Sequence, residues 1–286
     1  MPDFPQILRG LGEIAANYDA LICDVWGVLH DGHRARPDAV EALRRFRGEC
    51  GPVVLLSNAP RPVSVLEEQF ERFGVALDCC DAIVTSGVAT RAALAERAKG
   101  KRLAILHIGP ERDRGVFEGL PIDCVDAADA SVALCTGLFD DDTETPDDYR
   151  GMLADLKARG LAMLCANPDI VVQRGGKLIY CAGAIARLFE KMGGEAVYYG
   201  KPYRPIYDLT LETLRTLSKR DINRPLAIGD GLETDIRGAN GADLDALFIA
   251  DGIHGEDVGD FSPQGLAELF AKSGVSAKAA MRALVW

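Results

Sequence analysis

The sequence predicts an α/β protein built on a mostly parallel sheet. Short apolar runs recur along the 286 residues and alternate with longer amphipathic segments. Strands and helices that alternate in this way form parallel sheets through right-handed crossovers. The chain exceeds the usual size of a single core, ~100–200 residues, so we expect two domains or one domain with an insertion.

The predicted elements follow one another along the chain. Apolar runs predict strands over 20–23, 53–56, 82–85, 103–108, 132–135, 161–165, 197–199, 226–228 and 246–249. Amphipathic spacing predicts helices over 36–50, 63–73, 86–99, 146–159, 182–192, 205–218, 236–241 and 263–272. In the first of these helices, Val40, Leu43 and Phe46 recur at helical spacing with charged residues between them. A glycine pair inside 173–180 predicts a hairpin.

The composition argues against several classes of function. The net charge of −11 disfavours nucleic acid or an anionic membrane as a partner, because both bind basic surfaces. No apolar run reaches the ~20 residues that span a bilayer, and the first residues lack the features of a signal peptide. The eight cysteines include no CxxC pair, and several lie in apolar runs, which is typical of buried thiols in a reducing cytosol. We therefore expect a cytoplasmic protein.

Polar residues at the ends of predicted strands are the candidates for chemistry. They are Asp24, Ser57 with Asn58, Lys201, and Asp230 with Asp235. Each of them alone also fits a turn, a helix cap or a surface position. Because the carboxyl ends of neighbouring parallel strands share one edge of a sheet, together they predict a single crevice.

The residue types in this crevice indicate phosphoryl transfer. A donor set made up of several carboxylates favours a hard cation, most simply Mg²⁺. Lys201 supplies a positive charge for the carboxylates and for an anionic substrate, while Ser57 and Asn58 supply donors for phosphate oxygens. A carboxylate nucleophile, a metal and a lysine together form the apparatus for transfer through an aspartyl-phosphate.

The strand-end motifs resemble those of the haloacid dehalogenase (HAD) superfamily. They read Asp24-Val25-Trp26-Gly27-Val28, Ser57-Asn58, Gly200-Lys201-Pro202 and Gly229-Asp230-Gly231-Leu232-Glu233-Thr234-Asp235. The segment between the second and third motifs, with Ala166-Asn167-Pro168-Asp169 and Gly183-Ala184-Ile185, resembles the class IIA cap of NagD-like phosphatases. The resemblance implies a Rossmann-like HAD core over residues 1–99 and 196–286. It implies an inserted α/β cap over 100–195 that determines substrate specificity.

The resemblance also implies a role for each carboxylate. Asp24 would be the nucleophile and would bind Mg²⁺ together with Asp230 and the backbone carbonyl of Trp26. Asp235 would orient a metal-bound water, or would support the metal ligands without coordinating the metal itself.

Other residues would hold the substrate. By the same resemblance, Ser57 and Lys201 would hold the phosphoryl oxygens, and Asn58 would position the loop or the substrate. In the cap, Asp169 and Arg174 are candidates for substrate contacts, although the sequence Asn-Pro-Asp is also good turn chemistry.

Trp26 departs from the pattern of the family. Phosphatases of this family usually carry an aspartate there, which protonates the leaving group and then activates water; such assistance is typically worth ~10²–10⁴-fold. Three interpretations remain open. The substrates have good leaving groups, such as acyl or aryl phosphates or pyrophosphates; or His30 or Asp31 acts as a substitute acid and base; or the chain is not an efficient phosphatase.

The function that we predict is a Mg²⁺-dependent phosphohydrolase of a small phosphorylated metabolite. The alternatives are a low-turnover or regulatory metabolite-binding protein of the same fold, and a hydrolase of a non-phosphate bond. A homodimer is compatible with the resemblance, because relatives often dimerise, but no self-complementary patch in the sequence requires one.

Overall fold

The computed structural model describes residues 4–174, 177–218, 220–252 and 258–286, and describes Gln173 and Arg174 through their backbone alone. The chain folds into two compact units. The first unit comprises Met1–Ser57, Ser64–Val84 and Lys201–Trp286. The second comprises Asn58–Val63 and Thr85–Gly200, so a short stretch of the second unit interrupts the first.

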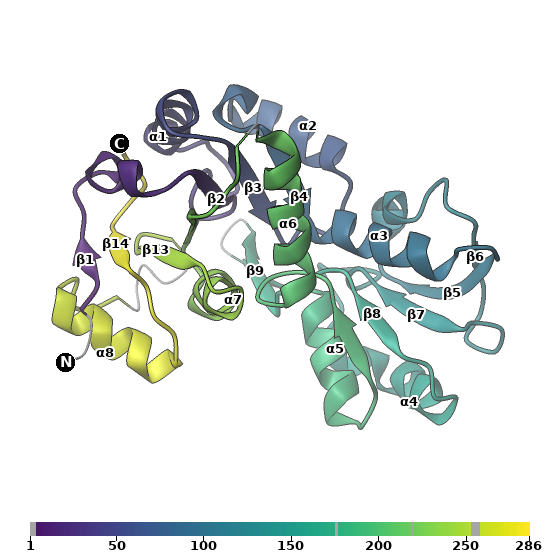
Figure 1. The fold of residues 1–286 in the computed structure, drawn as a ribbon. Helices are drawn as coiled ribbons and strands as arrows, with labels where there is room; N and C mark the ends of the chain where they lie inside the picture. The colour runs from purple at the N-terminus through teal and green to yellow at the C-terminus, as the bar shows by residue number, and fades with distance from the viewer. Residues whose placement is uncertain (1–3, 175–176, 219, 253–257) are drawn as a thin grey trace. The chain divides into compact units, whose positions relative to one another are not determined.

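A parallel sheet forms the centre of the first unit (Figure 1). Its strands lie in the order β1 (Gln6–Ile7), β14 (Ala279–Met281), β13 (Asp245–Ile249), β12 (Pro225–Gly229), β2 (Ala20–Asp24), β3 (Val53–Ser57) and β4 (Ala82–Thr85). Strand β2 pairs in parallel with β12 on one side and with β3 on the other. Cys23 lies opposite Ile228 and Leu55, so the carboxyl ends of the three strands are nearly level.

Helices cover both faces of this sheet. Helices α1 (Pro37–Glu49) and α2 (Val63–Phe73) pack on one face, and α7 (Arg237–Gly241) and α8 (Pro263–Ser273) pack on the other. Successive residues of β12 join opposite faces: Leu226 and Ile228 pack with the first pair of helices and Ala227 with the second. This alternation is the period of two that a strand requires. Helix α6 (Arg204–Leu217) buries Tyr207 and Leu214.

The second unit has a parallel sheet of its own. Its strands lie in the order β11 (Ala196–Tyr198), β8 (Met163–Cys165), β7 (Val132–Cys135), β5 (Leu103–Ile108) and β6 (Ile122–Cys124). Strands β9 (Val171–Arg174) and β10 (Lys177–Tyr180) form an antiparallel hairpin. The helices are α3 (Ser86–Arg97), α4 (Arg150–Ala158) and α5 (Ala182–Lys191), and Leu94 of α3 packs with Leu134 and Leu164 of the sheet.

The predicted fold class is confirmed, and the structure adds detail that the sequence pattern lacks. The short strands β1, β6 and β14 were not predicted, because two or three residues carry too little periodicity to be recognised. The predicted boundaries between core and cap, near residues 99 and 195, stay a prediction. The two structural units change at 57/58, 63/64, 84/85 and 200/201, so helix α3 groups with the second unit. In the described part of the chain, no helix combines the length and apolar character needed to cross a membrane.

Candidate active site

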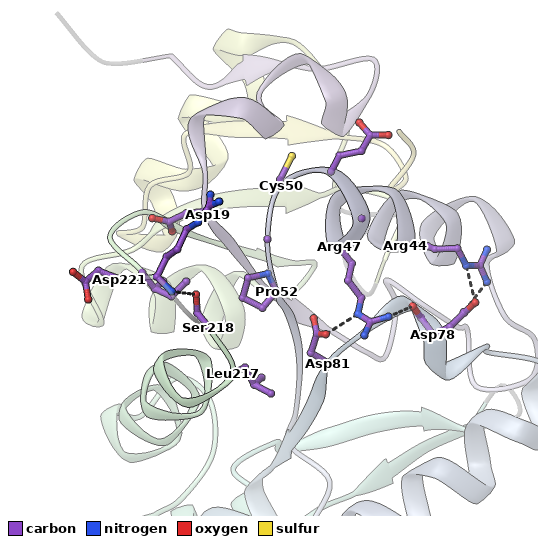
Figure 2. Close-up of a pocket in the computed structure, with 15 residues that line it drawn as sticks. Asp19, Arg44, Arg47, Cys50, Pro52, Asp78, Asp81, Leu217, Ser218 and Asp221 are labelled. Atoms are coloured by element: carbon purple, nitrogen blue, oxygen red, sulfur yellow. Dashed lines mark hydrogen bonds and ion pairs between the residues drawn. The ribbon is translucent and has the colours of Figure 1, made fainter.

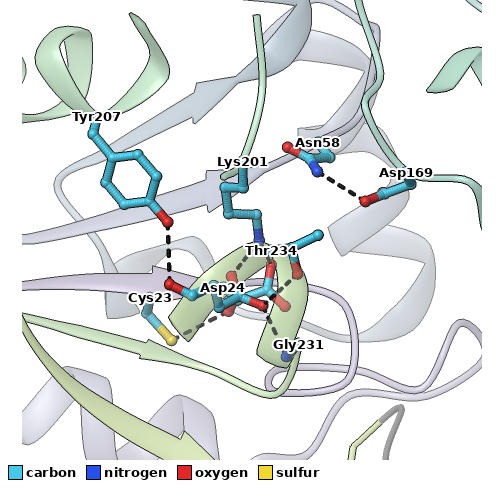
Figure 3. Close-up of polar contacts among 9 residues, drawn as sticks. Cys23, Asp24, Asn58, Asp169, Lys201, Tyr207, Gly231 and Thr234 are labelled. Carbon is cyan, nitrogen blue, oxygen red and sulfur yellow. Dashed lines mark hydrogen bonds and ion pairs between the residues drawn. The ribbon is translucent and has the colours of Figure 1, made fainter. Parts of the chain in front are cut away.

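Lys201 connects two of the predicted carboxylates. Its Nζ donates a hydrogen bond to Asp24 and another, at 2.6 Å, to Oδ1 of Asp235 (Figure 3). Lys201 is only 4% exposed, and both aspartates are buried. Burial alone would lower the pKa of Lys201, but Asp235 and Asp24 together hold that pKa well above its ordinary value. The lysine is therefore a cation at neutral pH.

Asp24, Asp230 and Asp235 form a buried cluster in which one carboxylate oxygen from each residue lies within 4.8 Å of the other two. Asp24 ends β2, and the other two lie in the loop and π-helical turn that follow β12. Burial, and then the charge of Asp235, raise the pKa of Asp24 well above its ordinary value, while Lys201 opposes the rise. A divalent cation would relieve the repulsion among these groups. An all-oxygen donor set of this kind suits a hard cation such as Mg²⁺.

Two glycines confine the carboxylate of Asp230. A Cβ atom on Gly27 would lie 2.0 Å from Oδ2 of Asp230, and a Cβ on Gly252 would lie at the same distance from that atom. Gly27 also has a φ of +85°, which side chains rarely adopt. The backbone therefore approaches Asp230 from two loops and fixes the direction of its carboxylate.

Trp26 and His30 pack against each other in the loop after β2. Their rings meet edge to face with centroids 5.1 Å apart, and the His30 ring also meets Phe73 at 5.0 Å. The Nδ1 atom of His30 accepts a hydrogen bond from the backbone N–H of Gly32 at 3.1 Å. Burial is the main cause that lowers the pKa of His30 to about 4, so this ring is neutral at pH 7.

Asp31, the other predicted substitute for the missing acid, is exposed. Its Oδ1 accepts hydrogen bonds from the backbone N–H groups of His33 and Arg34, both at 2.9 Å. These bonds are the main cause that lowers the pKa of Asp31, so its carboxylate is an anion at neutral pH and stabilises a turn.

The remaining predicted residues are divided between the units. Ser57 ends β3 in the first unit and is half-buried. Asn58 belongs to the second unit, where its Nδ2 donates to Oδ1 of Asp169 at 2.8 Å (Figure 3). Arg174 is the last residue of β9, and its side chain lies outside the described residues.

Sequence reasoning missed three residues that support the cluster. The hydroxyl of Tyr207, a buried residue of α6, donates to the backbone carbonyl of Asp235 at 3.3 Å. The hydroxyl of Thr234 donates to Oδ2 of Asp235 at 3.3 Å. Gly252 confines Asp230 as described above. Thr234 lies inside the last motif and could have been noticed. Tyr207 has the spacing of an ordinary core residue, and nothing near Gly252 in the sequence points to Asp230.

A hollow of about 780 Å³ lies at the opposite edge of the sheet in the first unit, around the amino ends of its strands (Figure 2). Two of its arginines are engaged with carboxylates: Arg44 binds Asp78 at 2.7 Å, and Arg47 binds Asp81 at 2.7 Å. The clustered carboxylates and Lys201 lie away from this hollow, at the carboxyl ends of the strands. That carboxyl edge is therefore the candidate site.

Comparison with known proteins agrees with the motifs. A family model described as haloacid dehalogenase-like hydrolase matches residues 21–122, and a HAD-hydrolase-like model matches residues 198–275. The crystal structure of a haloacid dehalogenase-like hydrolase from Brucella suis 1330 is 39% identical to the chain, with a TM-score of 0.85. That match covers 98% of this chain and 100% of the Brucella chain.

Two named phosphatases are also similar. The ribonucleotide monophosphatase NagD of Escherichia coli (strain K12) is 26% identical over 246 residues, which is 85% of this chain and 92% of NagD. The crystal structure of a glycerol phosphate phosphatase from Mycobacterium tuberculosis in complex with calcium is 22% identical, with a TM-score of 0.64. That match covers 84% of this chain and 68% of the Mycobacterium chain, and it shows that the two proteins share a fold.

The fold and the clustered carboxylates at the ends of neighbouring parallel strands define a HAD-type hydrolase. The identity with the Brucella protein over nearly the whole chain shows that this protein belongs to the haloacid dehalogenase-like hydrolase family. Within that family it is a class IIA, NagD-like phosphatase, a hydrolase acting on phosphoric esters.

Proposed function

We propose that the protein is a Mg²⁺-dependent phosphohydrolase of a small phosphorylated metabolite and that Asp24 is its nucleophile. The observation that carries this proposal is the contact of Lys201 with both Asp24 and Asp235, within a buried cluster that includes Asp230. A phosphate dianion and a carboxylate nucleophile repel each other, so their reaction needs fixed positive charge beside both. Lys201 supplies one such charge.

The proposed reaction has two steps. A carboxylate oxygen of Asp24 attacks the phosphorus while the bond to the leaving oxygen breaks, and the leaving group departs with that electron pair. Water then hydrolyses the aspartyl-phosphate, which releases inorganic phosphate and restores the carboxylate. Bound to Asp24, Asp230 and the backbone carbonyl of Trp26, Mg²⁺ would supply further neutralisation of charge on the phosphoryl group.

The chain's own residues orient the phosphoryl group in both steps. Lys201 stays charged and stabilises the phosphoryl oxygens, and Ser57 donates to them from the end of β3. Asp235 holds Lys201 in place through Oδ1 and is itself held through Oδ2 by the backbone N–H of Gly231 at 3.0 Å. In this assignment Asp235 acts on the reaction through the lysine and the metal ligands.

We extend the proposal to the leaving group. The indole of Trp26 is too weak an acid to protonate a leaving group, and the contacts of His30 and Asp31 support structural roles for both. A leaving group must then depart without a proton from this loop, which favours aryl phosphates, acyl phosphates and pyrophosphates over alkyl phosphates. Phosphorylated metabolites with weakly basic leaving oxygens are therefore the proposed substrate class.

The second unit is proposed to act as the cap that selects the substrate, with Asp169 and Arg174 as contacts for the leaving group. The hydrogen bond from Asn58 to Asp169 supports a fixed direction for the Asp169 carboxylate. In this proposal, the cap would include residues 58–63 and 85–200, a larger segment than the predicted 100–195.

A direct test compares phosphate release from p-nitrophenyl phosphate, acetyl phosphate and glycerol phosphate, with Mg²⁺ and with EDTA. We expect Mg²⁺-dependent turnover of the first two and much slower turnover of the third. The Asp24→Asn variant should release no phosphate, and Asp31→Asn, which changes an exposed aspartate of the same loop, should match the unmodified protein. Absence of Asp24-dependent release from all three compounds would contradict the proposal.

Trp26 also supports a second candidate, a metabolite-binding protein with little turnover. In that case calorimetry would detect a phosphorylated ligand binding in Mg²⁺, while none of the three compounds would be consumed. If the substrate carries no phosphate, calorimetry would detect no binding of a phosphorylated ligand and none of the three compounds would be consumed.

A further inference from the structure

The segment of residues 58–63, which we call the strap, follows β3 of the first unit directly but groups with the second unit. Ser57 ends β3, so a single peptide bond joins this proposed phosphate-binding residue to Asn58 of the strap. The residue before Lys201, Gly200, belongs to the second unit as well. Ser57 and Lys201, the two proposed phosphate-binding residues, are therefore each bonded in the chain to a residue of the second unit.

The strap is held at several points along its length. The carbonyl of Ala59 accepts from the backbone N–H of Gly87 at 3.0 Å, and the carbonyl of Arg61 accepts from the hydroxyl of Thr85 at 2.7 Å. A Cβ on Gly115 would lie 3.0 Å from Cγ of Pro62, so these two residues are in close contact. The strap is thus attached to both the start of α3 and the segment after β5.

Asn58 brings the strap against Gly200. A Cβ on Gly200 would lie 2.5 Å from Oδ1 of Asn58 and 2.8 Å from Oγ of Ser86. The Ser86 hydroxyl also donates to the carbonyl of Tyr199 at 2.9 Å. No side chain fits between the strap and the residue that precedes Lys201. The position of Asn58 and the position of Gly200 are therefore set together.

An ion pair also attaches the strap to the second unit. Nε of Arg61 donates to Oδ1 of Asp113 at 2.9 Å, and the Asp113 side chain is only 3% exposed. Burial raises the pKa of Asp113, and the charge of Arg61 opposes that rise. The pair joins the strap to the segment after β5, and removal of one partner of a buried ion pair is destabilising, so the pair favours one direction of the strap.

We propose that Arg61 is a positioning residue: through Asp113 it holds the strap against Gly200 and so sets the spacing of Ser57 and Lys201. The inference rests on the proposed function, because it assigns both residues to the phosphate. It predicts that the Arg61–Asp113 pair tunes the affinity for the phosphoryl group without touching it.

The test measures the KM for p-nitrophenyl phosphate and the inhibition constant of inorganic phosphate in Mg²⁺, well below the unfolding temperature. Arg61→Ala should raise both constants by about tenfold, because small displacements of binding groups weaken binding and catalysis strongly. Asp113→Asn should also raise both constants. Because it keeps the size of the side chain, it is the variant to use if Arg61→Ala does not fold. Arg61→Lys should restore most of the affinity. Arg102→Ala is the matched control, because it breaks an exposed pair with Asp123 in the same unit and should change neither constant.

The outcomes separate this inference from the proposed function. If the unmodified protein turns over the substrate and folded Arg61→Ala or Asp113→Asn leaves both constants within twofold, the positioning role is overturned and the proposed function stands. The positioning role is also overturned if Arg102→Ala raises both constants equally, since a general loss of stability would then explain the effect. If the unmodified protein releases no phosphate, the proposed function fails and this inference fails with it.

Discussion

The side chain of Asp235 joins Lys201 to the loop that follows β12. Its Oδ1 accepts from Nζ of Lys201 at 2.6 Å, and its Oδ2 accepts from the backbone N–H of Gly231 at 3.0 Å. The lysine is therefore anchored to the same loop that carries Asp230. A displacement of this loop would move the proposed phosphate-binding cation and the proposed metal ligand together.

Replacement of Lys201 by Met should destabilise the protein as well as abolish turnover. The variant leaves three buried carboxylates without their cation, and breaking a buried ion pair in this way costs about 3–5 kcal/mol. Urea unfolding in EDTA measures the loss. Addition of Mg²⁺ should recover part of it, because the metal replaces the missing charge. An unchanged midpoint in EDTA would contradict the role of Lys201 as the compensating charge.

Asp24→Asn should have the opposite effect on stability. It removes one of the clustered negative charges while Lys201 keeps its bond to Asp235, so the metal-free variant should be more stable than the unmodified protein. The gain should disappear in Mg²⁺, which stabilises the unmodified cluster more than the variant. Thermal unfolding of both proteins, in EDTA and in Mg²⁺, gives the comparison. A metal-free variant less stable than the unmodified protein would disprove the expected repulsion.

Gly252→Ala should weaken binding of the metal. The new methyl group would lie 2.0 Å from Oδ2 of Asp230 and must displace the carboxylate. Changes beside metal ligands typically cost about 10–100-fold in affinity. Calorimetric titration with Mn²⁺, as a stand-in for Mg²⁺, measures this. Gly241→Ala is the matched control, since its methyl group would meet no atom within 4 Å. Equal affinities in all three proteins would refute the confinement of Asp230.

His30 should make the protein acid-sensitive. Its pKa is about 4 in the folded state against an ordinary 6.5, so the unfolded chain binds the proton more readily. The contribution of neutral His30 to the free energy of unfolding is complete above pH 6.5 and is lost as the pH falls towards 4. The total loss is on the order of 3 kcal/mol. His30→Asn keeps an acceptor for Gly32 and does not titrate. Its stability should therefore fall less steeply over this range.

The control for that experiment is His33→Asn, an exposed histidine of the same loop. This variant shows whether the loss of any histidine from the loop changes the pH dependence of unfolding. The His30→Asn variant also tests the acid–base alternative at pH 7. We expect turnover of p-nitrophenyl phosphate within a few-fold of normal, whereas a catalytic acid would cost about 10²–10⁴-fold.

Trp26→Asp should broaden the range of leaving groups. The new carboxyl group stands where the family carries its acid, so the rate on glycerol phosphate relative to p-nitrophenyl phosphate should rise by at least about tenfold. Trp26→Phe is the control, because it keeps an aromatic ring beside His30 and adds no acid. The measurement is the ratio of kcat/KM for the two substrates. An equal ratio in Trp26→Asp and the unmodified protein would contradict the proposed restriction to good leaving groups.

The sequence was sufficient to predict the fold class and the convergence of Asp24, Asp230, Asp235 and Lys201. Each lies just after an apolar strand, and the edge of a parallel sheet brings such positions together. The environment of His30 could not be predicted, because its burial against Phe73 depends on a helix some forty residues away in the chain. The roles of Gly252 and Tyr207 could not be predicted for the same reason. Their effects on Asp230 and Asp235 arise from close approach in space, and a single sequence carries no record of that.

The strap has a consequence for protein engineering. A chimaera that exchanged only residues 100–195 would transplant Asp113 and Asp169 but leave Arg61 and Asn58 behind. The donor segment would arrive without the partners of two of its carboxylates, one of them buried. Working chimaeras should instead carry residues 58–63 and 85–200 from one parent, joined at the unit changes 57/58, 63/64, 84/85 and 200/201.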